Sequence, residues 1–195
     1  MKKRIFLAAL ATVTISFGLG LNSLVAHADD SVTKDSVGEF SVTAGSLSLD
    51  AVPNFNFGTT DVATLVKGTT LNYQSGANNT LAVSDYRGAS DGTWSLTASL
   101  APFKNGKDES ESLVAGAINL KSSVADNSKA TGATGTIGSA ASTVWNNTNA
   151  DLTGTGTATS TVSTDTTLVT EANSKINSGS YSSTVTWTMA NTSAN

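Results

Sequence analysis

The chain has 195 residues, a net charge of −4 and no cysteine. This acidic balance argues against binding nucleic acid or other anionic polymers through charge attraction. The lack of cysteine excludes a disulfide framework and a thiol nucleophile. The length is sufficient for one domain with a hydrophobic core.

The first 28 residues are typical of a secretory signal peptide. Basic residues at positions 2–4 precede an apolar run from Ile5 to Leu21, and Ala26-His27-Ala28 forms a small-x-small cleavage site. Cleavage after Ala28 leaves one domain, residues 29–195, with eight basic and fifteen acidic residues and a net charge of −7. A retained membrane anchor is the alternative, but the apolar run is short for one. We expect no direct membrane span, and non-covalent attachment if the protein stays on a cell.

Short stretches of alternating apolar and polar residues predict β-strands, since successive strand side chains point to opposite faces. The first surrounds Phe40 and Val42, and a turn at Ala44-Gly45 follows it. Further candidates are residues 46–49, 51–58, 70–73, 80–85, 93–100, 113–120, 142–145, 158–163, 166–170 and 181–189. The turn-rich residues 86–92 predict that the strands on either side of them are neighbours joined by a surface loop.

Polar segments between these strands predict loops. The acidic residues 104–111 predict a solvated loop, and residues 121–160, rich in Thr, Ser, Ala, Gly and Asn, predict long loops with only short strands. No helical periodicity of useful length follows the signal peptide. The sequence therefore predicts an all-β fold, an antiparallel β-sandwich of the immunoglobulin-like or Greek-key type with long loops rich in Thr, Ser and Gly.

Two of the predicted strands carry a tryptophan on their apolar face. One pairs Trp94 with Leu96 on this face, and the other pairs Trp187 with Met189. Because each tryptophan shares its face with an aliphatic side chain, we favour packing in the core over stacking on sugar rings. Trp145 lies in polar surroundings and is the better candidate for an exposed ring.

Catalytic equipment is scarce. His27 is the only histidine and lies in the predicted signal peptide, so the secreted chain lacks a Ser-His-Asp triad and the usual zinc ligand sets. A two-carboxylate glycosidase needs only two acids at the right separation. The candidate acids are Asp85, Asp91, Asp108, Glu109 and Glu111. All lie beside turn-forming residues, so we favour solvated loop acids and expect no catalysis, no metal and no cofactor.

Several segments together carry a family resemblance. Residues 83–85, Val-Ser-Asp, precede residues 93–98, Thr-Trp-Ser-Leu-Thr-Ala, and the chain ends with 181–189, which contains Trp-Thr-Met. The earlier segments 45–50 and 52–58 belong to the same set. In this order, behind a signal peptide, they resemble the WxL surface-domain family of low-GC Gram-positive bacteria. Methionine stands where the second motif usually has leucine, a nearly volume-conserving change that a core tolerates.

The resemblance implies a secreted protein held non-covalently on the cell wall, with peptidoglycan as its ligand. It also implies complexes with other cell-surface proteins, including a membrane-anchored one. Adhesion to a host and the role of an accessory subunit both stay open. We therefore expect a non-enzymatic wall-attachment module in which the two tryptophan motifs are structural. The candidate ligand contacts are Trp145, Asp85 and Asp91.

Two other functions stay open at this point. The chain could be a protein-binding subunit that docks on a membrane-anchored partner, since short strands at a sheet edge can be completed by another protein's strand. It could also be a glycosidase that acts through Asp85 or Asp91.

Overall fold

A computed structural model describes residues 34–88, 93–124, 131–147 and 156–192, apart from the side chains of residues 108–113 and 124. The predicted signal peptide, residues 1–28, lies outside these ranges and stays a prediction. The chain divides into two compact units, residues 1–41 and 42–195. Every described strand belongs to the second unit.

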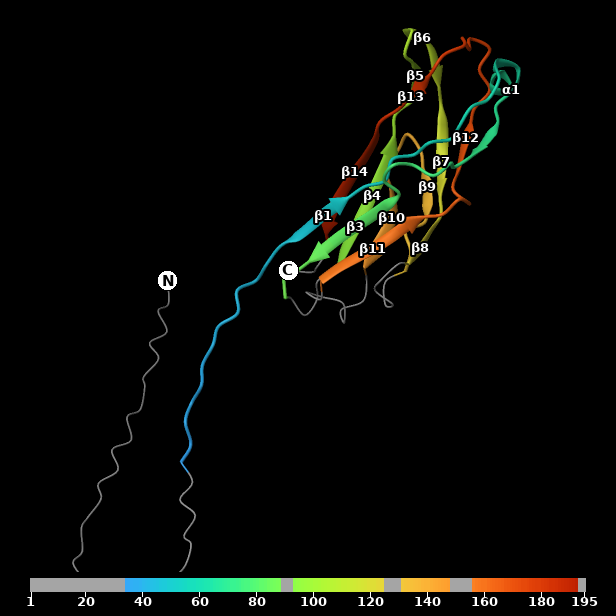
Figure 1. Ribbon diagram of the computed structural model, residues 1–195. Coiled ribbons are helices and arrows are strands. Elements are labelled where there is room, and N and C mark those ends of the chain that lie inside the picture. Colours follow the sequence, from blue (N-terminus) through green and yellow to red (C-terminus); the bar gives the residue numbers. More distant parts are fainter. Residues whose placement is uncertain (1–33, 89–92, 125–130, 148–155, 193–195) are drawn as a thin grey trace, which may run out of the picture. The chain divides into compact units, whose positions relative to one another are not determined.

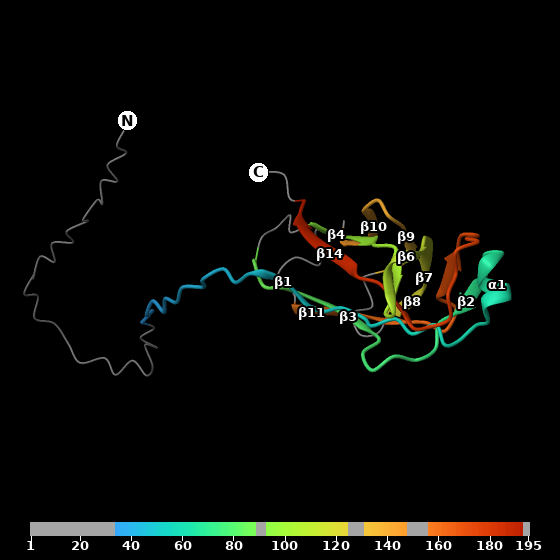
Figure 2. The same ribbon diagram turned by 90° about the horizontal axis from the view of Figure 1, so that it is seen from above.

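Two antiparallel sheets face each other in the second unit. The first has the order β1 (Leu47–Ala51), β3 (Thr80–Asp85), β11 (Gly156–Val162) and β8 (Ser122–Val124). The second has the order β10 (Ser142–Asn147), β4 (Trp94–Leu100) and β14 (Val185–Asn191). Seen from above, β1, β3 and β11 form one layer, and β4, β10 and β14 form the other (Figure 2). The predicted antiparallel β-sandwich is confirmed.

Two further sheets extend this sandwich. One has the order β2 (Thr70–Asn72), β12 (Thr167–Thr170), β7 (Gly116–Leu120) and β9 (Gly135–Ile137). The other has the order β13 (Tyr181–Ser182), β5 (Phe103–Asn105) and β6 (Asp108–Val114). The short helix α1 (Val62–Val66) lies at the same end of the unit as β5, β6 and β13 (Figure 1).

Strand β4 lies at the centre of the core. Its four inward side chains are at most 3% exposed, and they are Trp94, Leu96, Ala98 and Leu100. The residues between them are half-buried. Leu81 and Val83 of β3 join the same hydrophobic cluster from the opposite sheet. Burying one large apolar side chain stabilises a fold by about 1.5–3 kcal/mol, so the alternation predicted for residues 93–100 reflects a core on one side of the strand.

The C-terminal strand keeps its predicted alternation although it is interrupted. Odd-numbered residues from 181 to 189 are half-buried, and the even-numbered residues between them are exposed. Strand β13 pairs with β5, whereas β14 pairs with β4. The chain therefore passes from one sheet to another at residues 183–184, where we had predicted a single strand.

The prediction of a solvated loop at residues 104–111 is wrong. Strands β5 and β6 form an antiparallel hairpin there, with Asn105 opposite Asp108. The Asn105 side chain accepts a hydrogen bond from the Lys107 backbone N–H at 2.9 Å, which closes the turn locally. Backbone pairing and turn chemistry make this element, and neither requires apolar residues.

The prediction that residues 80–85 and 93–100 form neighbouring strands is also wrong. Strand β3 pairs with β1 and β11, whereas β4 pairs with β10 and β14. Five of the six β3 residues are buried. A strand covered in this way lies inside the sandwich, and β3 and β4 belong to opposite layers of it.

Residues 121–160 contain more strand than predicted. Strands β8, β9 and β10 lie in this range, and β11 begins there. The hydroxyl of Ser122 donates to the Ala133 carbonyl at 2.6 Å and lies 2.5 Å from the hydroxyl of Ser160, which is fully buried. Small hydroxyl side chains can be buried here because they satisfy backbone groups and one another.

At the N-terminal side, two predicted strands do not form as expected. Residues around Phe40 and Val42 lie outside every strand. Of the segment 51–58, Ala51 ends β1 and Asn56 makes an isolated bridge with Gln74. In these two segments, the alternation of apolar and polar residues therefore does not indicate pairing within a regular sheet.

Replacing Trp94 with alanine should lower the free energy of unfolding by about 3–5 kcal/mol, because the surrounding core cannot refill the cavity. Urea unfolding followed by circular dichroism measures this loss. The control is Val169→Ala, since Val169 is 39% exposed, and we expect a loss below about 1 kcal/mol there. A Trp94→Ala loss as small as that of the control would contradict the central position of β4.

Candidate functional site

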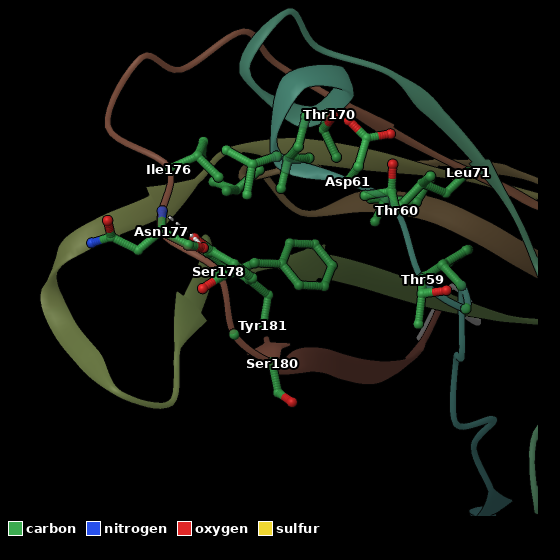
Figure 3. A pocket seen from close by; sticks show the side chains of 18 of the residues that line it. Thr59, Thr60, Asp61, Leu71, Thr170, Ile176, Asn177, Ser178, Ser180 and Tyr181 are labelled. Atoms are coloured by element: carbon green, nitrogen blue, oxygen red, sulfur yellow. Dashed lines mark hydrogen bonds between the residues drawn. The ribbon is translucent and has the colours of Figure 1, made fainter.

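A groove of about 600 Å³ opens at the end of the unit that carries α1, β5, β6 and β13. We call it the end groove. One wall is the segment 55–62, which follows β1 and ends at the first residue of α1. The opposite wall is the segment 176–181, which ends at the first residue of β13. Thr59, Thr60 and Asp61 lie on one side of it and the side chains from Ile176 onward on the other (Figure 3).

The apolar lining of the end groove lies where two hydrophobic clusters meet. Leu71 and Leu168 pack in the main core, whereas Leu65 and Val114 belong to a smaller cluster near α1. Phe103 packs against both clusters. Because this lining is held by packing from two sides, the groove is pre-formed, as ligand sites usually are.

Phe55 and Phe57 give the first wall an aromatic face. Their rings are stacked, with centroids 6.1 Å apart and an angle of 8° between the ring planes. Tyr73 is 4% exposed and packs edge-on against both rings. The isolated bridge between Asn56 and Gln74 fixes the backbone between the two phenylalanines. These half-buried rings are therefore held in place while they line the groove.

The second wall is closed by its own hydrogen bonds. The Tyr181 hydroxyl donates to the Asn177 carbonyl at 2.8 Å and accepts from the Asn177 backbone N–H at 3.2 Å. The side chain of Asn105, fully buried, donates to the same carbonyl at 3.3 Å. Gly179 lies against this side chain so closely that a Cβ would be 2.6 Å from its Oδ1.

Asp61 carries the only charge among the described residues that line the end groove. It caps α1, a helix too short to be predicted from periodicity. The Thr64 backbone N–H donates to its Oδ1 at 2.8 Å and the Thr64 hydroxyl to its Oδ2 at 2.7 Å. These two hydrogen bonds hold the pKa of Asp61 below its usual value. The carboxylate is therefore charged at neutral pH and already engaged in the helix cap.

Hydroxyl and amide groups make up the remaining polar lining. The side chains that supply them are Asn56, Thr59, Thr60, Thr170, Asn177, Ser178, Ser180 and Tyr181. Together with the stacked rings, they suit a ligand that has apolar faces and many neutral hydrogen-bonding groups.

The two tryptophan motifs lie outside this groove. Trp94 and Leu96 are buried in the main core, and the half-buried Trp187 and Met189 pack against it. In the ladder between β4 and β14, Met189 lies opposite Leu96. The motifs thus contact one another through the sheet.

The expectation of an exposed ring at Trp145 is wrong. Trp145 is 2% exposed, and its ring packs edge-on against Trp94 with centroids 5.2 Å apart. Its indole N–H donates to the Thr131 carbonyl at 2.7 Å. The polar neighbours of Trp145 in the sequence suggested exposure. Its ring is buried because the groups that cover it come from other segments of the chain.

The other two candidate ligand contacts do not line the end groove either. Asp85 is 4% exposed and forms a salt bridge with Arg87 at 2.8 Å. The hydrogen bond from the Arg87 side chain holds the pKa of Asp85 below its usual value, against the opposing effect of burial. Asp91 lies outside the described residues.

Sequence reasoning missed both walls of the end groove. The alternation of Phe55 and Phe57 beside Gly58 was visible, but it predicted only a strand. The segment 176–181 reads as a polar connection, and no local pattern indicates that it lies opposite residues more than a hundred positions earlier.

Fold and groove together define an all-β domain with a candidate ligand site. The family model of the WxL domain, described as surface cell wall-binding, matches residues 27–192. The chain therefore belongs to the WxL family, as its motifs predict, and it is associated with the cell surface or cell wall. No curated protein and no solved structure matches it. In the part of the chain that the structure describes, no helix is long and apolar enough to cross a membrane.

Stability at acidic pH should depend on the salt bridge between Asp85 and Arg87. Because the pKa of Asp85 is lowered by folding, its stabilising contribution is present above the unfolded value of about 3.9 and lost as the pH falls through the folded value. Unfolding free energies of the wild type and Asp85→Asn, measured from pH 7 to pH 2, should differ most above pH 5 and converge at low pH. A difference that stays constant with pH would contradict this assignment.

Gly179→Ala should destabilise the second wall, since the added methyl group meets the buried, hydrogen-bonded side chain of Asn105. We expect a loss of about 1–3 kcal/mol in urea unfolding, the usual effect of overpacking. Gly138→Ala is the matched control, because a Cβ at Gly138 meets nothing within 4 Å, and its effect should stay within about 0.5 kcal/mol. Equal effects of the two substitutions would argue against the close packing at Gly179.

Proposed function

We propose that this WxL chain is a non-enzymatic module that attaches to the cell wall by binding peptidoglycan in the end groove. The observation that carries the proposal is the groove itself, with stacked phenylalanine rings on one wall and hydroxyl and amide groups around them. We further propose that residues 29–195 act as one domain after removal of residues 1–28, and that the two tryptophan motifs have a structural role.

Peptidoglycan has the chemistry that this groove suits. Its glycan strands carry apolar sugar faces, hydroxyl groups and neutral acetamido groups. Phe55 and Phe57 offer ring faces for stacking on a sugar, and the apolar lining near Leu71 offers a place for an acetamido methyl group. Hydroxyls such as those of Thr59 and Ser178 supply hydrogen-bonding partners along the rim.

Charge supports the same mode of binding. The sequence is acidic overall, and Asp61 is the charged residue in the described lining. Attraction between opposite charges is therefore a weak contributor, and binding should depend little on salt. Shape and hydrogen bonding must supply the affinity.

We also propose that the domain catalyses no reaction. A glycosidase needs two carboxyl groups on either side of the bond it cleaves. The described lining of the end groove offers only Asp61, whose two oxygens both accept hydrogen bonds from Thr64. Of the acids considered from the sequence, Asp85 is paired with Arg87 and does not line this groove. Asp91 and the side chains of Asp108, Glu109 and Glu111 lie outside what the structure describes.

Co-sedimentation with protein-stripped, teichoic-acid-free peptidoglycan tests the proposal. Wild-type protein should bind saturably and with weak salt dependence. Phe57→Ala should weaken binding about tenfold or more, because it removes one stacking ring, and Ser178→Glu should do the same by placing a hydrated charge in the groove. Thr164→Glu is the matched control, since Thr164 is exposed, lies outside the lining and undergoes the same change in charge.

Thermal unfolding of each variant separates lost binding from lost folding. Equal binding by Ser178→Glu and Thr164→Glu would overturn the end groove as the site. No binding to stripped peptidoglycan, with retention on envelopes that keep their proteins, would favour docking on a membrane-anchored partner. Release of reducing sugar would contradict a non-enzymatic role.

A further inference from the structure

Asn105 of β5 lies directly behind the second wall of the end groove. It is fully buried, and its backbone pairs with Tyr181, the last residue of that wall. Its side-chain amide donates to the Asn177 carbonyl at 3.3 Å, and its Oδ1 accepts from the Lys107 backbone N–H at 2.9 Å. Gly179 packs against this amide so closely that an added Cβ would lie 2.9 Å from its nitrogen. The second wall is therefore held against an uncharged side chain at residue 105.

The residue that follows makes Asn105 chemically reactive. Of the asparagines in the sequence, only Asn105 precedes a glycine. In such a pair the backbone nitrogen of the glycine attacks the asparagine Cγ, since no side chain hinders its approach. A bond from this nitrogen to Cγ closes a succinimide ring, the bond from Cγ to Nδ2 breaks, and the amide group leaves as ammonia with the proton of the backbone nitrogen. Water then opens the ring at one of its two carbonyl carbons and gives aspartate or isoaspartate.

The closed wall suppresses this reaction. The Gly106 N–H, whose nitrogen must attack, donates to the Ser180 carbonyl at 2.9 Å. The Asn105 amide donates to the Asn177 carbonyl, and full burial of Asn105 excludes the water that the second step needs. Both of these hydrogen bonds end on the second wall, so both break when the wall separates from β5. The reaction is therefore coupled to local opening of the wall.

The products are incompatible with the closed wall. A carboxylate at residue 105 has no hydrogen to donate, so one of its oxygens would face the Asn177 carbonyl oxygen without a hydrogen bond. It would also place a negative charge in a fully buried position, which costs free energy unless the charge is paired. Isoaspartate adds a carbon to the backbone and disturbs the pairing of β5 with Tyr181. Either product therefore favours the open wall.

We propose that Asn105 is a deamidation site that controls the end groove: opening of the second wall permits the reaction, and the acid formed keeps the wall from closing again. A ligand in the groove contacts the second wall and holds it closed, so the ligand slows the reaction. A chain that stays unoccupied loses its ability to bind with time. This consequence rests on the proposed binding in the end groove, whereas the coupling between reaction and wall does not.

Deamidation kinetics test the coupling. Protein is incubated in mildly alkaline buffer, and peptide mass spectrometry measures the rate at residue 105. Gly179→Ala should react about tenfold faster than wild type or more, because the added methyl group pushes the wall away from Asn105. Gly138→Ala is the matched control and should react at the wild-type rate, since a Cβ there meets nothing within 4 Å. Equal rates in Gly179→Ala and wild type would overturn the proposal. So would a wild-type rate that is the same with and without denaturing urea.

Aged protein tests the consequence for the groove. The deamidated form, separated by anion exchange through its added negative charge, should show faster amide hydrogen exchange at residues 177–180. It should also bind stripped peptidoglycan about tenfold more weakly than unmodified protein, because a buried hydrogen bond of the wall is lost. Gly106→Ala should age without either change, since its side chain hinders the attack and an added Cβ lies 3.8 Å from the nearest atom, the Ser180 carbonyl oxygen.

The outcomes separate this inference from the proposed function. Unchanged exchange or unchanged binding in the deamidated form would overturn the control of the groove by Asn105. Unmodified protein that fails to bind peptidoglycan, combined with faster exchange after deamidation, would overturn the proposed function and support the coupling between reaction and wall.

Discussion

Antiparallel pairing between β4 and β14 is the constraint on which the rest of the structure depends. Thr97 and Thr188, hydrogen-bonded across these strands, are 91 residues apart. Closing so long a loop costs conformational entropy, which the burial of apolar side chains on β4 must offset. No disulfide shortens the loop, because the chain has no cysteine. The chain enters β14 through β13, which pairs with β5 and ends the second wall of the end groove.

Much of the fold could be predicted where one side of a strand faces the core. The alternation at 93–100 and 181–189 arises because inward residues such as Trp94 are buried and their neighbours are not. Prediction failed at β6 and β8, which are rich in charged or small residues, because turn geometry and hydroxyl hydrogen bonds stabilise those strands. Strand partners could not be predicted, since the register of β3 with β11 has no local signal.

The candidate site was far less predictable than the fold. Trp145 has polar neighbours in sequence, yet Trp94 and the Thr131 carbonyl cover its ring from other segments. The walls of the end groove come from residues 55–62 and 176–181, which meet only because the sheets bring them together. The stacked rings of Phe55 and Phe57 line a groove only because the segment 176–181 lies opposite them. The order of residues along the chain does not show that these two segments are close in space.

The claim that the end groove binds the glycan of the cell wall is tested most directly by amide chemical-shift mapping. Soluble peptidoglycan fragments would be titrated into isotope-labelled protein. We expect saturating shifts at residues 55–61 and 176–181, with little change on the outward face of β4 and β14. Shifts confined to that outward face, or no shifts at saturating fragment, would contradict it.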